Sequence, residues 1–154
     1  MFQVLRARMG KRDEGFSLIE LMIVVLIIAI LIAIAIPTFL GARSKSQDRA
    51  AQVDLRQALL TAKGYYTDNE TYDADVADLT ALEPTLEFVA MTDATADGGE
   101  VGFLGGSTTV VFAKASKSGA WFCIAEDVPT GTTFGRGTAL SEVDSAAECA
   151  DASW

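Results

Sequence analysis

The chain of 154 residues contains no histidine and only two cysteines. Without histidine it cannot form a Ser-His-Asp or Cys-His nucleophilic pair or a histidine-ligated metal site. Cys123 and Cys149 are too few for a four-cysteine zinc site and too far apart for a C-x-x-C redox motif. The glycine-rich segment 102–106 lacks the spacing and the lysine of nucleotide-binding loops. The sequence therefore predicts neither an enzyme nor a bound cofactor.

Hydrophobic and charged residues are distributed unevenly along the chain. Half of the residues are hydrophobic, yet the formal net charge is −9. Residues 21–36 form a run of 16 without one charged or hydrogen-bonding side chain, whereas residues 67–154 are polar and acidic. The length suits one domain of roughly 100 to 200 residues. The chain therefore combines one membrane-grade segment with one soluble segment.

The apolar segment is long enough to cross a membrane. Residues 16–36 would form a helix about 31 Å long, which matches a hydrocarbon core of about 30 Å. Their aliphatic side chains favour insertion by about 7 kcal/mol, which outweighs the cost of about 3 kcal/mol for the single acid, Glu20. Basic residues before the segment predict one membrane pass with the N-terminus in the cytoplasm. These residues are Arg6, Arg8, Lys11 and Arg12.

A secretory signal peptide and a plain membrane anchor are two simpler interpretations of this segment. Residues 33–35, Ala-Ile-Ala, are similar to a signal peptidase site. However, the apolar run exceeds the usual length of about 7 to 15 residues, Glu20 lies within it and Pro37 follows it. A plain anchor leaves Glu20 unexplained. The acid therefore favours a more specific interpretation.

The residues around this acid resemble a known processing signal. Residues 15–21 are Gly-Phe-Ser-Leu-Ile-Glu-Leu, and the apolar run that follows ends in Ala-Ile-Pro at 35–37. This pattern resembles the class III signal of type IV pilins and of the pseudopilins of type II secretion. The resemblance covers residues 14 to about 66 and is only general beyond them.

The resemblance implies a processing pathway and a set of partners. A prepilin peptidase would cleave after Gly15, Phe16 would become the N-methylated first residue, and the apolar segment would stay attached. Glu20 falls on the family's glutamate and Pro37 on its helix-kinking proline. The implied partners are further copies of the chain in a helical filament, the peptidase, and an assembly platform with its ATPase. Membrane lipid surrounds the segment before assembly.

Glu20 has a physical role in this scheme. Cleavage would create a cationic amine on Phe16, and Glu20 lies one helical turn further along. Unpaired charges facing lipid are costly, so both groups need partners. In a bundle of staggered helices, the carboxylate of one copy can reach the amine of another, which favours registered assembly. The simpler alternative is that Glu20 extends to the membrane interface.

The sequence predicts an α+β fold with a type IV pilin-like arrangement. Pro37 predicts a bend or local melting of the helix. Residues 38–66 continue as an amphipathic helix whose apolar stripe requires a sheet packed against it, and polar residues break any coiled-coil heptads. The stripe comprises Ala51, Leu55, Ala58, Leu59, Ala62 and Tyr66.

The head is predicted to contain a sheet of about four antiparallel strands. Segments with strand chemistry are 86–91, 100–104, 108–114 and 121–126, whereas 67–85 is predicted to be an irregular loop. The predicted organisation is therefore a cleaved leader (1–15), a membrane half of the helix (16–37), an amphipathic half (38–66) and a head (67–154).

Cys123 and Cys149 are predicted to form a disulfide, because an envelope-exposed chain with two cysteines is expected to join them. The loop they close would add about 3.5 kcal/mol of stability in the chain-entropy model. A disulfide-bounded C-terminal region also belongs to many type IV pilins that this chain resembles. Two free buried thiols are the alternative.

The acidic charge bears on partners and on metal binding. Removing the leader takes four of the 12 basic and two of the 21 acidic residues, and leaves 8 minus 19, or −11. Nucleic-acid binding is therefore not expected. Asp93, Asp97 and Glu100 are weak calcium candidates without the loop pattern of a calcium site, so a solvated loop is favoured.

Two functions remain after these arguments. The leading hypothesis is a structural subunit of a type IV pilus, anchored in the cytoplasmic membrane as a precursor and extracellular when mature. The alternative is a pseudopilin of a type II secretion system. Both share every feature up to about residue 66, and the disulfide-bounded tail favours the pilin.

Overall fold

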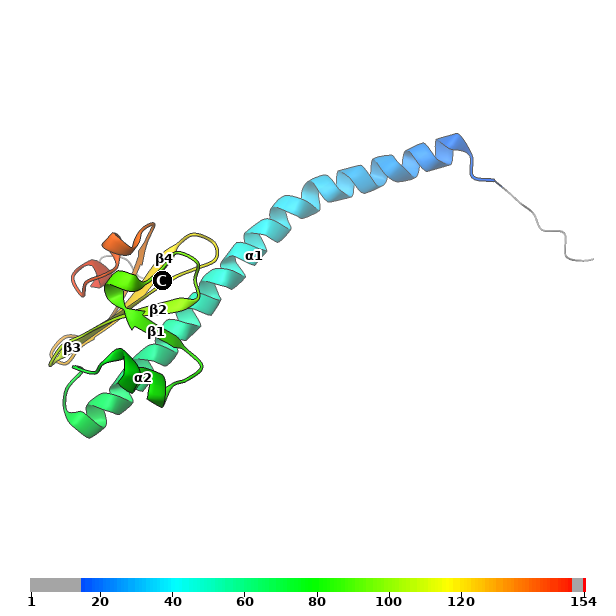
Figure 1. Ribbon diagram of the computed structural model, residues 1–154. Helices are drawn as coiled ribbons and strands as arrows, with labels where there is room; N and C mark the ends of the chain where they lie inside the picture. Colours follow the sequence, from blue (N-terminus) through cyan, green and yellow to red (C-terminus); the bar gives the residue numbers. More distant parts are fainter. Residues whose placement is uncertain (1–14, 151–153) are drawn as a thin grey trace, which may run out of the picture. The chain divides into compact units, whose positions relative to one another are not determined.

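The computed structural model describes residues 15–150 and Trp154, so most of the predicted leader lies outside the described residues. Two helices and five strands follow one another along the chain (Figure 1). They are α1 (Leu18–Asn69), α2 (Val76–Leu82), β1 (Glu87–Ala90), β2 (Glu100–Gly105), β3 (Thr109–Ala115), β4 (Trp121–Asp127) and β5 (Gly131–Gly137). Three single 3₁₀ turns are η1 (Met91–Asp93), η2 (Leu140–Glu142) and η3 (Glu148–Ala150). The predicted α+β fold is confirmed.

The described residues divide into two units at Leu40 and Gly41, with α1 contributing to both. We refer to residues 41–154 as the head. The helix stays continuous through Pro37, so the predicted local melting there is wrong. Proline removes only one backbone hydrogen-bond donor from the helix. In the same turn, the hydroxyl of Thr38 adds a hydrogen bond to the carbonyl of Ile34 at 3.1 Å.

The amphipathic stripe of α1 is buried in the head as predicted. Ala51, Leu55 and Ala58 are each 1% exposed or less. They pack with aromatic and aliphatic side chains from β1 to β4, and each fully buried large side chain contributes roughly 1.5–3 kcal/mol. The strand residues of this cluster are Phe88, Val101, Phe103, Val110, Phe112, Phe122 and Ile124.

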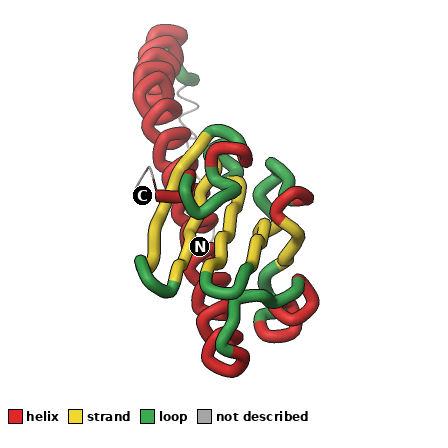
Figure 2. The backbone as a smooth tube through the Cα atoms, turned by 90° about the vertical axis from the view of Figure 1, so that its left-hand side faces the viewer, coloured by secondary structure: helices red, strands yellow, loops and turns green. Residues whose placement is uncertain are grey.

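The head sheet has five strands in the order β1-β2-β3-β4-β5, one more than predicted (Figure 2). Pairing is antiparallel from β2 to β5, but β1 and β2 are parallel, with Glu87 opposite Glu100. The predicted antiparallel sheet is therefore confirmed for β2 to β5, and the parallel pairing of β1 with β2 is the one departure from it. A parallel pair requires the chain to return to the end of the sheet where β1 begins. Because β1 has only four residues, the nine residues 91–99 are enough to make this return. Strand β5 escaped prediction because three of its seven residues are glycines.

The segment between α1 and β1 is more regular than predicted. Helix α1 continues to Asn69, three residues past the predicted end, and α2 occupies part of the predicted loop. A capping box begins α2: the backbone N–H of Asp78 donates to the carboxylate of Asp75, and that of Asp75 to the carboxylate of Asp78. Leu79 anchors α2 in the core and is 0% exposed. The aspartates therefore start a helix rather than a solvated loop.

Both faces of the sheet are buried. Side chains that alternate with the helix-facing ones form a second cluster beneath the C-terminal segment. Val111, Ala113, Cys123 and Ala125 contribute from the strands, and Val143 and Cys149 from the segment that covers them. The C-terminal residues therefore supply the second layer of the core.

Candidate functional site

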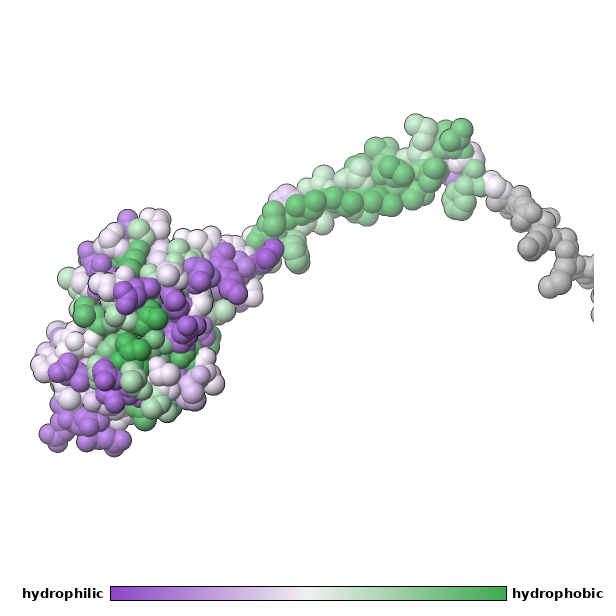
Figure 3. All heavy atoms as spheres, viewed as in Figure 1, coloured by the Kyte–Doolittle hydropathy of each residue, from purple (hydrophilic) through white to green (hydrophobic). Residues whose placement is uncertain are grey.

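The N-terminal part of α1 exposes large apolar side chains on all sides. A stretch of 18 residues in this part has a mean hydropathy of 3.3 and contains no buried residue. Among the described residues, α1 is the one helix that is long and apolar enough to cross a membrane. Figure 3 shows a continuous hydrophobic surface along this part of α1, in contrast to the mixed surface of the head. Such a surface is not stable in water and needs lipid or other protein around it.

Glu20 lies in the first turn of α1, where its side chain and that of Ser17 cap backbone N–H groups at the start of the helix. Its carboxylate accepts a hydrogen bond from the backbone N–H of Ser17 at 3.1 Å, while the Ser17 hydroxyl accepts one from the N–H of Ile19 at 3.3 Å. An acid at this end also suits the helix dipole. Sequence reasoning missed this local role, although the pattern Ser-x-x-Glu was available to indicate it. Glu20 therefore caps the helix in addition to any role in assembly.

The predicted processing residues lie just before the helix. Gly15 has no atoms within 4 Å of the position a Cβ would take, and the Phe16 side chain is 81% exposed. Both residues precede the first residue of α1, Leu18. Gly15 and Phe16 are therefore exposed and outside regular secondary structure.

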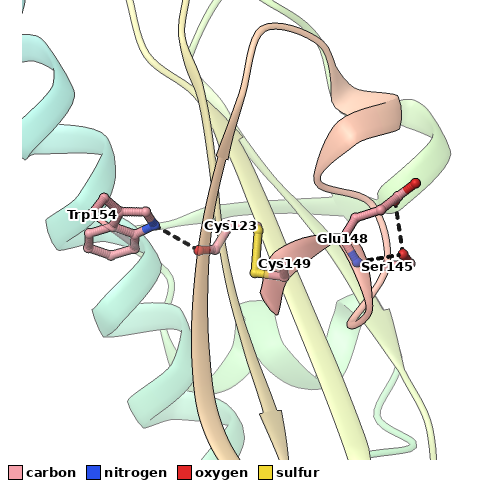
Figure 4. Close-up of a disulfide and its surroundings, with 5 residues drawn as sticks. All are labelled: Cys123, Ser145, Glu148, Cys149 and Trp154. Carbon is pink, nitrogen blue, oxygen red and sulfur yellow. Dashed lines mark hydrogen bonds between the residues drawn. A yellow bond between two sulfur atoms is a disulfide. The ribbon is translucent and has the colours of Figure 1, made fainter. Parts of the chain in front are cut away.

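A disulfide closes the C-terminal region of the head. Cys123 in β4 and Cys149 in η3 are bonded, with 5.8 Å between their Cα atoms, and both are fully buried (Figure 4). The indole N–H of Trp154 donates to the carbonyl of Cys123 at 2.9 Å. Gly135 makes the close approach possible, because a Cβ there would lie 2.6 Å from the Cys123 sulfur. No local pattern in the sequence indicated this role for Gly135.

The weak calcium candidates belong to a loop that is held by internal hydrogen bonds. The hydroxyl of Thr95 donates to the carboxylates of Asp97 at 3.0 Å and Glu100 at 2.8 Å. The backbone N–H of Gly99 donates to Asp97, and this bond lowers the pKa of the Asp97 carboxyl below its usual value. Asp93 hydrogen-bonds only with Thr92 among the described residues. Within those residues no three metal-ligating side chains come together.

An internal cation fixes the same loop to α1. The ammonium group of Lys114 donates to the carbonyl of Gly99 at 2.7 Å and forms an ion pair with Asp54 at 3.5 Å. Lys114 is almost completely buried. A lysine in a strand gives no sequence signal for such a role, because its partners lie far away in the chain.

Comparison with known proteins finds one family model and several partial relatives. Residues 10–36 match the family described as the prokaryotic N-terminal methylation motif. This part of the chain is type IV pilin-like. The type IV major pilin protein PilA of Myxococcus xanthus is 41% identical over 66 residues, which cover 43% of this chain and 30% of that protein.

Two further relatives come from different filament systems. The type IV wide pilus major component PilA4 of Thermus thermophilus is 40% identical over 72 residues, covering 47% of this chain and 55% of that protein. The type II secretion system core protein G of Pectobacterium carotovorum is 30% identical over 80 residues, covering 51% of each chain. The chain thus spans between 30% and 55% of the length of these relatives. No solved structure matches it significantly.

The motif and the helix together characterise the chain. An exposed apolar helix that begins within the methylation motif fits a membrane-anchored precursor and a surface filament. The relatives are named as pilins and as a secretion core protein, and none as an enzyme. The predicted resemblance to pilins and pseudopilins is therefore confirmed.

Proposed function

We propose that this pilin-like protein is a structural subunit of a type IV pilus. The observation that carries the proposal is the apolar half of α1, which is exposed on all sides and continuous with the methylation motif. A permanent lipid anchor would explain its hydrophobicity but not the motif. Packing of many such helices against each other buries the same surface outside the membrane.

The proposed pathway begins with a precursor whose N-terminus is cytoplasmic. Prepilin peptidase cleaves after Gly15, the new amine on Phe16 is methylated, and an assembly platform with its ATPase extracts the subunit into a filament. The exposure of Gly15 and Phe16 supports access by a peptidase. Nucleic acid is not expected as a partner, because the processed chain is strongly acidic.

The decisive test is N-terminal analysis of protein sheared from the cell surface. We expect a chain that begins at a methylated Phe16 and contains the intact disulfide. A surface protein that begins at Met1 would contradict the processing step, and one that begins at Ile36 would indicate an ordinary signal peptide.

Glu20 is the proposed assembly residue, and its second role in capping determines which variant tests it. Glu20→Gln keeps an acceptor for the Ser17 N–H but removes the charge that would pair with the amine of a neighbouring copy. We expect normal membrane insertion and a loss of sheared filaments of about tenfold or more, because an unpaired amine remains in an apolar bundle. Glu70→Gln in the head is the matched control. Normal filaments from Glu20→Gln would show that pairing is not required.

A pseudopilin of type II secretion is the second candidate, and the likeness to core protein G supports it. One feature of the head favours the pilus: the disulfide-closed tail. Abundant shed filaments made of this protein would support the pilus. Loss of protein secretion in a deletion strain that has no filament defect would support the pseudopilin.

A further inference from the structure

The face of α1 that points away from the sheet carries cations and exposed apolar side chains. Its members recur at spacings of three and four residues, so they share one side of the helix opposite the buried stripe. Val53 and Leu60 are 58% and 63% exposed. We name this surface the α1 outer face; it comprises Lys45, Arg49, Val53, Arg56 and Leu60.

No carboxylate lies on the α1 outer face, because both acids of this stretch of helix turn toward the head. Asp48 accepts hydrogen bonds from the hydroxyls of Ser116 and Ser118, and Asp54 pairs with Lys114. Arg56 rests over the ring of Trp154 at 4.8 Å. On a chain with a large excess of acids, this face is therefore a local positive surface.

A second surface has the opposite charge and the same mixture of polar and apolar groups. Asp68 and Asp78 are exposed beside Leu82, which is 54% exposed, and Asp75 is exposed at the start of α2. A shallow depression of about 270 Å³ lies between Asp68 at the end of α1 and Leu82 on α2. We name these four residues the α2 patch.

The C-terminal end of α1 adds to the negative potential of the α2 patch. Cations are favoured near the last turn of a helix, but α1 has no basic residue there and carries Asp68 instead. The ion pairs among the described residues are Lys63 with Glu126 and Lys114 with Asp54. Neither pair includes a residue of the α1 outer face or of the α2 patch, so the described residues do not neutralise these two surfaces. A cation from outside the head would complete this helix end.

We propose that the α1 outer face of one copy docks on the α2 patch of a second copy. The cations meet the aspartates, and Val53 or Leu60 meets Leu82, so charge and apolar surface are matched together. When one surface of a copy binds a different surface of the next copy, the contact repeats without closing and gives an open filament. An anionic membrane would match the cations alone and leave the α2 patch unexplained. The inference rests on the proposed function, because it requires that the chain polymerise.

The geometry of α1 makes the contact directly testable. Lys45 and Asp68 are separated by about 35 Å along the same helix, at roughly 1.5 Å per residue. A carbodiimide joins an amine to a carboxylate only when the two are in contact. A bond between Lys45 and Asp68 must therefore join two different copies.

The first experiment treats sheared filaments of the full protein with carbodiimide and maps the products by mass spectrometry. We expect a bond from Lys45 to Asp68, Asp75 or Asp78. Filaments that form but contain no such bond would overturn the docking proposal and leave the proposed function standing. Absence of any filament from the unaltered protein would instead contradict the proposed function.

The second experiment exchanges charges. Arg49→Glu is expected to lower the yield of sheared filaments by about tenfold, because it places like charges opposite each other. Asp68→Lys alone should have a similar effect, and the two changes in one chain should restore the yield, since this one charge pair is then reversed at every interface between copies. Lys117→Glu, an exposed reversal outside both surfaces, is the control and should leave the yield unchanged.

Folding is monitored in the same variants by disulfide formation and by thermal melting in detergent. Asp68→Lys should melt no lower than the unaltered protein, because a cation suits the end of α1. A loss of filaments from Arg49→Glu that Asp68→Lys does not restore would overturn the proposal.

Discussion

One helix serves two different environments in this protein, and the difference lies in how its apolar residues are arranged. Up to Leu40 they surround α1 and none of the described ones is buried; after Gly41 most of them form one stripe that the sheet covers, while Val53 and Leu60 stay exposed. A helix that is apolar on all sides belongs in lipid or in a helix bundle, whereas a single stripe specifies docking onto a globular head. The following predictions test this division.

The largest effect is expected from matched leucine truncations in the two parts of α1. Leu55→Ala should lower the free energy of unfolding of the head by about 4 kcal/mol, because a fully buried side chain leaves a cavity. Leu31→Ala, at a position 61% exposed, should change it by less than about 0.5 kcal/mol. Denaturant titration of the full protein in detergent measures both. Equal losses would mean that the apolar part also supports the head.

Removal of the disulfide should affect the head alone. Changing both Cys123 and Cys149 to alanine should cost about 3.5 kcal/mol of head stability, because the unfolded chain regains the entropy of the closed loop. Circular dichroism should show the helical signal of the apolar segment unchanged in detergent. A variant as stable as the unaltered protein would show that burial of the tail, rather than the bond, holds the second layer.

Loss of the α2 cap should have a smaller effect. Asp75→Ala removes the acceptor for the Asp78 N–H and should destabilise the head by about 1 kcal/mol. Asp75→Asn retains a capping oxygen and should recover most of this loss. If the two variants unfolded at the same denaturant concentration, the hydrogen bond would not be what stabilises α2.

The smallest effect concerns acid. The backbone N–H and the hydroxyl of Thr138 donate to Glu142 and lower the pKa of its carboxyl below 4.5. A lowered pKa adds stability above pH 4.5 that is lost as pH falls through the folded-state value. Glu142→Gln should therefore lose less stability than the unaltered protein between pH 5 and about pH 3. If the melting temperatures of the variant and of the unaltered protein fell equally over this range, the lowered pKa of Glu142 would not contribute to stability.

Local patterns were sufficient to predict several elements of the head. Four strand segments and the stripe from Ala51 to Ala62 follow from periodicity, and burial in the structure matches both. Strand β5 and helix α2 were not predicted. Strand β5 is rich in glycine, which is uncommon in strands. Helix α2 begins with aspartates that are also typical of loops; their capping box and the burial of Leu79 in the core together explain why a helix forms there.

The sequence by itself determined the division between an apolar helix and an acidic head, because hydrophobicity and charge are local properties of the chain. It also indicated the processing motif and the pairing of Cys123 with Cys149. Only the tertiary structure decided that β1 is parallel to β2, that Lys114 holds the loop before β2, and that Gly135 admits the disulfide. Each of these depends on contacts between residues distant in the chain, and no local pattern specifies such contacts.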